Sequence, residues 1–152
     1  MTPGEFATLR ARVQLHEGTG PTQDGRFFPY TDTVGKVTIG WGHNLTDRGI
    51  SGADAAKLLD DDLVSHIAQL TQTHPIVLTL SAERQIVLGE MAFNLGVPRL
   101  SGFKKMWAAL AVGDFDQAAL EMLDSKWATQ VHGRATRLAE ELRRGELLNE
   151  VV

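Results

Sequence analysis

Apolar residues recur at helical spacing along much of the chain. Apolar positions three or four apart predict amphipathic helices over residues 5–15 and over about 51–70. Gly18 and the residues after it are expected to stop the first helix, and Ser51 is a suitable N-cap for the second. The inward face of this second helix is predicted to consist of Leu59, Leu63, Ile67 and Leu70.

The second half of the chain continues in helices. A helix over residues 81–94 is apolar nearly all round, which predicts a buried central element that Gly96 and Pro98 end. Shorter helices are expected over 102–111 and 114–123, and a basic helix over about 133–144, which Gly145 ends.

Between the first two helices, the pattern changes to alternation. Residues 27–45 alternate and are interrupted by glycines, and the Val-Gly-Lys at their centre suits a hairpin turn. The fold class is therefore α+β and mainly α, with one small antiparallel β-ribbon. We expect one two-lobed domain over 1–152. Its parts are a β-containing lobe at about 16–50, a connecting helix at about 51–73, and a helical lobe at about 74–152 plus the N-terminal helix 4–15.

Composition excludes several classes of protein. Without cysteine the chain has no disulfide, no thiolate nucleophile and no cysteine-based metal site. No apolar run approaches the roughly 20 residues of a membrane span, and residues 1–13 lack the pattern of a secretory signal. A net charge of −4 argues against nucleic acid as the partner.

Candidate chemistry is concentrated between residues 16 and 44. Glu17, Asp32 and Thr38 lie around the glycine-rich ribbon, and two carboxyl groups with a hydroxyl suit acid/base cleavage of a glycosidic bond. Each also has an ordinary explanation. Glu17 could be a solvated helix end, Asp32 a turn former, and Thr38 a simple β-former.

A family resemblance supports the chemical interpretation. Glu-Gly followed by Y-T-D-T-V-G-K-V-T-I-G-W-G-H resembles the signature of the T4-type phage lysozymes, or endolysins, and F-N-L-G, S-G-F and S-K-W-A-T-Q extend the likeness toward the C-terminus. The resemblance implies that Glu17 is the general acid, and that Asp32 and Thr38 position the attacking water. The loop over 18–29 is longer than is common in that family and contains Asp24, an alternative second carboxylate.

Further residues are supporting or substrate-binding candidates. Asp62 lies closest to the apolar stripe of its helix, and a carboxylate turned inward needs a partner. The resemblance points to His43 as that partner and suggests that Arg134 pairs with Glu17, although a solvated basic face is the ordinary explanation for Arg134. Trp127 is more typical of a core residue than of a sugar platform. The substrate-binding candidates are Trp41, Asn94, Lys126 and Gln130. For Trp41, hydrophobic packing is an equally good explanation.

Taken together, the resemblance implies a muramidase that hydrolyses the β-1,4 bond between N-acetylmuramic acid and N-acetylglucosamine. It implies inversion at the anomeric carbon, no cofactor or metal, and peptidoglycan glycan strands as the partner of a monomer. Such an endolysin is made in the bacterial host cytoplasm and reaches the wall in the periplasm through a holin-type pore, without direct contact to the holin. Two alternatives remain: a lytic transglycosylase acting on the same bond, and a non-catalytic peptidoglycan-binding module.

Overall fold

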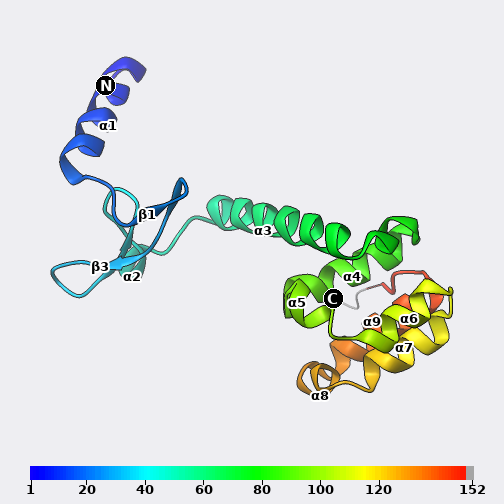
Figure 1. Cartoon of the computed structure of the whole chain (residues 1–152). Coiled ribbons are helices and arrows are strands. Elements are labelled where there is room, and N and C mark those ends of the chain that lie inside the picture. Colours follow the sequence, from blue (N-terminus) through cyan, green and yellow to red (C-terminus); the bar gives the residue numbers. More distant parts are fainter. Residues whose placement is uncertain (150–152) are drawn as a thin grey trace. The chain divides into compact units, whose positions relative to one another are not determined.

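The computed structural model describes residues 1–149 and has the mainly helical α+β architecture that the sequence predicts (Figure 1). The chain divides into two compact units, a small unit over Met1–Ala56 and a helical unit over Lys57–Val152. Helix α3, Gly52–Thr73, contributes to both. The predicted lobe boundaries, and the assignment of the N-terminal helix to the helical lobe, stay predictions.

Helix α1 of the small unit spans Pro3–Glu17, slightly longer at both ends than its apolar pattern predicts. Its first turn is closed by a capping box. The Thr2 hydroxyl accepts a hydrogen bond from the Glu5 amide at 3.3 Å, and the Glu5 carboxylate accepts one from the Thr2 amide at 2.6 Å. Gly18 follows with φ of 66°, a backbone conformation that turns the chain away and leaves Glu17 as the last helical residue.

The small unit contains two antiparallel sheets. Strands β1 (Thr22–Gln23) and β2 (Arg26–Phe27) form a hairpin. The second sheet has the order β3-β4-β5, from Tyr30–Thr31, Val37–Ile39 and His43–Asn44. The predicted turn at Val-Gly-Lys is confirmed, because it lies in the loop that connects β3 to β4. Helix α2, Leu45–Arg48, follows β5, and neither α2 nor the first hairpin was predicted.

Helices α3 and α4 (Ala82–Leu95) lie on either side of a short 3-10 helix, η1 (Pro75–Thr79). The predicted caps are both present, since Ser51 accepts from the Asp54 amide at 3.1 Å and Ser81 accepts from the Arg84 amide at 3.4 Å. Of the four side chains predicted to face inward from α3, Leu70 is fully buried and Leu63 half-buried. The other two, Leu59 and Ile67, remain exposed.

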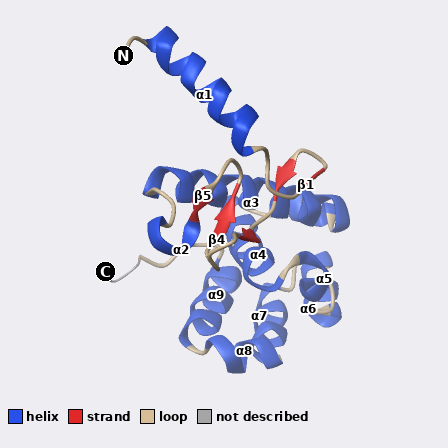
Figure 2. Ribbon diagram, turned by 90° about the vertical axis from the view of Figure 1, so that its left-hand side faces the viewer, coloured by secondary structure: helices blue, strands red, loops and turns tan. Residues whose placement is uncertain are grey.

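Five further helices complete the helical unit: α5 (Val97–Leu100), α6 (Lys104–Ala111), α7 (Phe115–Leu123), α8 (Lys126–Val131) and α9 (Gly133–Arg144). Helix α7 contacts α6 and α9, and α9 also packs on α4 and α8 (Figure 2). The largest side chains fully buried here are Leu70, Leu88, Met91, Leu100, Met106, Leu110, Met122, Leu138 and Leu142. Within residues 1–149, no helix is both long and apolar enough to span a membrane.

Arg84 on α4 ties that helix to the C-terminal end of α9. Its Nε donates to the carbonyl of Leu142 at 2.8 Å and a terminal nitrogen donates to that of Arg143 at 3.1 Å, while the guanidinium lies 3.5 Å from the centroid of the Phe115 ring. We expect Arg84→Met to lower the free energy of unfolding by about 2 kcal/mol, because it removes both hydrogen bonds and the cation–π contact. Urea unfolding would measure the loss, with the exposed Arg99→Met as the control. Equal stability of the two variants would contradict this.

His74 is expected to make the free energy of unfolding depend on pH. Its ring stacks on Trp107 with centroids 3.8 Å apart, and its Nε2 lies 2.8 Å from the Ser101 hydroxyl. Burial lowers the pKa of His74 from its ordinary value of 6.5. The folded state therefore favours neutral His74, and this contribution to stability is complete above pH 6.5 and lost as the pH falls through the folded-state pKa.

The comparison of the parent with His74→Gln tests this dependence. Between about pH 7.5 and 5.5, the parent's free energy of unfolding should fall more steeply than that of the variant, which has no titrating group at this position. Chemical denaturation at a series of pH values would measure both slopes. Parallel slopes would show that His74 does not contribute.

Candidate active site

Glu17 ends α1 and points its carboxylate toward the glycine-rich ribbon. The main chain of Gly42 comes so close that a Cβ placed on Gly42 would lie 3.7 Å from Glu17 Oε2. Gly42 also has a φ of 81°, which favours glycine. The small unit therefore holds one exposed carboxyl group beside the Trp41-Gly42-His43 segment, without relying on any other part of the chain.

Asp32 is half-buried at the end of β3 and is held by the loop that follows it. Its Oδ1 accepts hydrogen bonds from the amides of Val34 at 3.0 Å and Lys36 at 2.8 Å. This is the turn-forming role that its sequence context predicts, and it also fixes the direction of the carboxylate. Among the described residues no hydrogen bond to Oδ2 is recorded, so this second oxygen is the one that can accept from a water molecule.

Thr38 lies on β4, the central strand of the second sheet, and is only 3% exposed. It pairs with Tyr30 on one side and with Asn44 on the other. Asp32 follows directly after β3, the strand that pairs with β4, so Asp32 and Thr38 belong to two neighbouring strands of one sheet and the turn between them. The Thr38 hydroxyl donates to the Lys36 carbonyl at 3.3 Å, which leaves its lone pairs as acceptors beside the loop that holds Asp32.

Asp24, the alternative second carboxylate, occupies a different environment. It forms the tip of the β1–β2 hairpin together with Gly25, and the φ angles of the two residues are 50° and 75°. Two successive positive φ angles are typical of the tight hairpin turn that an Asp-Gly pair favours. Asp24 is exposed there and its position is explained by the turn.

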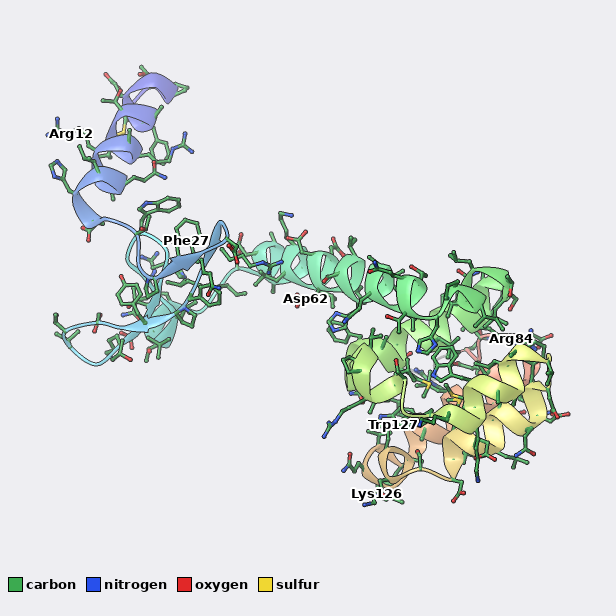
Figure 3. The ribbon with its side chains drawn as sticks, in the orientation of Figure 1. Arg12, Phe27, Asp62, Arg84, Lys126 and Trp127 are labelled. Atoms are coloured by element: carbon green, nitrogen blue, oxygen red, sulfur yellow. The ribbon has the colours of Figure 1, made fainter. Side chains whose placement is uncertain are left out.

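The predicted supporting pair, His43 and Asp62, is divided between the two units. His43 Nε2 donates to the Gly49 carbonyl at 2.5 Å within the small unit. Asp62 is exposed on α3 of the helical unit, where its main-chain carbonyl accepts from His66 Nδ1 at 2.7 Å (Figure 3). The structure thus gives His43 a local partner, and the pairing with Asp62 stays a prediction.

The helical unit carries the other predicted substrate-binding residues. Trp127 is only 5% exposed, as expected of a core residue, and its indole N–H donates to Asn94 Oδ1 at 2.8 Å. Lys126 precedes it at the start of α8 and is exposed (Figure 3). Gln130 is exposed as well. Substrate binding by Asn94, Lys126 and Gln130 stays a prediction.

Arg134 is exposed near the start of α9 and lines a hollow of about 430 Å³ with Glu90, Gly133 and Arg137. Arg137 forms ion pairs with Glu90 at 3.6 Å and with Glu141 at 3.9 Å. The basic face is therefore partly neutralised within its own unit, and the approach of Arg134 to Glu17 stays a prediction.

One feature of the site was missed by the sequence reasoning. Phe27, on β2, packs against Trp41 with ring centroids 4.8 Å apart and an interplanar angle of 55° (Figure 3). Trp41 was predicted as a sugar-binding residue, but its partner was not. The Asp24-Gly25 pair is the signal that would have revealed the hairpin that carries Phe27.

Comparison with known proteins places the chain in a family. The sequence profile of the family described as Phage lysozyme matches residues 22–145. The pre-baseplate central spike protein Gp5 of Enterobacteria phage T4 is 29% identical over 146 residues, which cover 78% of this chain and 25% of that protein. The probable T4-type lysozyme 2 of Dictyostelium discoideum is 25% identical over 147 residues, covering 78% of this chain and 86% of that protein.

The family match extends over most of the chain, and the chain therefore belongs to the phage lysozyme family. The chain spans about a quarter of the length of the phage spike protein that it matches. The matched range contains Asp32 and Thr38 and begins after Glu17. Membership in this family supports a muramidase-like glycoside hydrolase activity.

Proposed function

We propose that this protein is an endolysin muramidase that hydrolyses the β-1,4 bond between N-acetylmuramic acid and N-acetylglucosamine in peptidoglycan. The observation that carries the proposal is the pair of carboxyl groups that one small unit presents in different environments. Glu17 is exposed beside Gly42, while Asp32 is half-buried and held by two main-chain amides. Two carboxyl groups with separate roles are what hydrolysis of a glycoside requires.

In the proposed mechanism, Glu17 is the general acid that protonates the departing sugar oxygen. Asp32 activates a water through Oδ2, and Thr38 helps to position that water on the opposite face of the sugar. This arrangement inverts the anomeric carbon, which calls for a separation of about 6.5–9.5 Å between the two carboxyl groups in the substrate complex. No cofactor takes part in these steps.

The product of digestion distinguishes this function from its nearest alternative. Purified peptidoglycan should release fragments that end in a reducing N-acetylmuramic acid, since hydrolysis adds one water across the cleaved bond. A lytic transglycosylase would release an anhydro product lighter by one water, and a binding module would release nothing. Mass spectrometry of the soluble fragments separates these three results, and only the first supports the proposal.

The biological setting follows from the same proposal. A phage endolysin of this kind acts on the wall in the periplasm at the end of infection, after a holin-type pore has released it from the host cytoplasm. Its partner is the glycan strand, bound by a monomer, and it makes no direct contact with the holin. Co-expression with and without a holin would test the release step, because host lysis should require both.

A further inference from the structure

The β1–β2 hairpin is a preformed element that stands between Glu17 and Asp32 in the chain. Its tight Asp24-Gly25 turn sets the register, which pairs Thr22 with Phe27. The segment before the hairpin is tied to the second sheet, because the Gly20 amide donates to the Gly40 carbonyl at 3.1 Å. These contacts fix the position of Phe27 relative to the glycine-rich ribbon.

Phe27 and Trp41 together form what we call the aromatic platform. Phe27 is half-buried, whereas Trp41 stays 41% exposed although it contacts the Phe27 ring. The other two tryptophans of the chain, Trp107 and Trp127, are 9% and 5% exposed. Trp41 is therefore the most exposed of the three tryptophans, and one side of its indole packs on the tilted Phe27 ring.

The platform adjoins the proposed general acid. Trp41 immediately precedes Gly42, whose main chain approaches Glu17 Oε2, so Trp41 is the chain neighbour of the residue that lies beside the carboxylate. His43, which follows Gly42, and Arg26, which precedes Phe27 on β2, are exposed and polar. An exposed indole inside a polar surrounding suits a ligand that is itself apolar on one face and hydrogen-bonding at its rim.

We propose that the aromatic platform is a sugar subsite, on which a pyranose ring of the glycan strand stacks next to the bond that is cleaved. In this subsite Trp41 makes the contact and Phe27 is a positioning residue that acts through Trp41. The occupant is a hexopyranose of the strand, because its C–H face matches the indole while its hydroxyl and acetamido groups reach the polar surrounding. This proposal rests on the proposed function, which supplies a glycan at Glu17.

Binding is measured in the Glu17→Gln background, so that it does not depend on cleavage. The probe is a set of soluble peptidoglycan fragments of defined length, titrated against tryptophan fluorescence and acrylamide quenching. We expect the fragments to protect Trp41 from the quencher. Trp41→Ala should weaken binding about tenfold, and Phe27→Ala should weaken it severalfold.

Controls separate stacking from folding. Phe28→Ala, at an exposed phenylalanine next to Phe27 in the chain, should leave affinity unchanged. Trp41→Phe keeps an aromatic ring and should recover part of the affinity that Trp41→Ala loses, even if the alanine variant folds poorly. In the protein with Glu17 intact, Phe27→Ala should raise KM and leave kcat unchanged. A general loss of structure would lower kcat as well.

Failure of the subsite and failure of the proposed function give different results. A parent that cleaves peptidoglycan, while Trp41→Ala and Trp41→Phe bind fragments as tightly as the parent, would overturn the subsite and leave the activity in place. A parent that binds fragments through Trp41 but never cleaves them would keep the subsite and overturn the muramidase. The subsite would also be overturned if bound fragments did not reduce the quenching of Trp41 by acrylamide.

Discussion

Replacing Glu17 with Gln is expected to lower the rate of peptidoglycan hydrolysis by a factor of about 10² to 10⁴. The amide has the shape of the carboxyl group but cannot supply the proton that the departing sugar oxygen needs. Glu17 is exposed at the end of α1, and among the described residues no ion pair to its carboxylate is recorded, so the fold should tolerate the change. The decrease in turbidity of Gram-negative cells stripped of their outer membrane would measure the rate.

A matched substitution separates loss of the acid from loss of negative charge. Glu146→Gln removes an exposed carboxylate in the helical unit and should clear the cells as fast as the parent. Circular dichroism and thermal unfolding of both variants would establish that they are folded. If folded Glu17→Gln clears cells at more than a tenth of the parent's rate, Glu17 is not the general acid.

Helix boundaries were the part of the fold that the sequence predicted best. Ser51 and Ser81 each precede a helix whose first turn donates to the serine hydroxyl. Gly145 follows α9 in a left-handed conformation, with φ of 71°. These signals are local, since a cap involves residues only a few positions apart, so they can be recognised without knowledge of the tertiary structure.

Features that depend on contacts distant in sequence were not predictable in the same way. Trp127 and Asn94 share a hydrogen bond across 33 positions of sequence. A Cβ on Gly89 would lie only 2.7 Å from Ile67 Cδ1, so the absence of a side chain at Gly89 allows α3 and α4 to approach. Neither contact can be recognised from the spacing of apolar residues in the sequence. Strands β1 and β2 have two residues each, too short for alternation to stand out.

The candidate site shows the same division between local and distant information. Residue type and motif singled out Asp32 as a carboxylate near a turn, but its two amide donors became visible only in the folded loop. Trp41 was predicted from its residue type and its place on the ribbon beside Gly42, whereas its contact with Phe27, which a separate hairpin carries, became visible only in the folded structure. Sequence therefore singled out the candidate reacting groups but not the residues that contact them.

Asp32→Asn is expected to reduce hydrolysis by a factor of about 10² or more. The amide oxygen of Asn can still accept hydrogen bonds from Val34 and Lys36, so the loop should keep its conformation. What the variant loses is the anionic oxygen that activates the attacking water. The fold and the affinity for soluble fragments should therefore remain near those of the parent while the turnover rate falls.

The matched control is Asp24→Asn, which makes the same chemical change in the alternative carboxylate. Asn tolerates the positive φ of 50° at this position, so the hairpin and the aromatic platform should persist. We expect Asp24→Asn to clear cells within about twofold of the parent, because Asp24 lies at a hairpin tip and has no part in the proposed chemistry. A slow Asp24→Asn beside a fast Asp32→Asn would transfer the second role to Asp24. In that case the tip of the β1–β2 hairpin would have to reach the cleaved bond, and the sugar subsite proposed for Phe27 and Trp41 could not lie there.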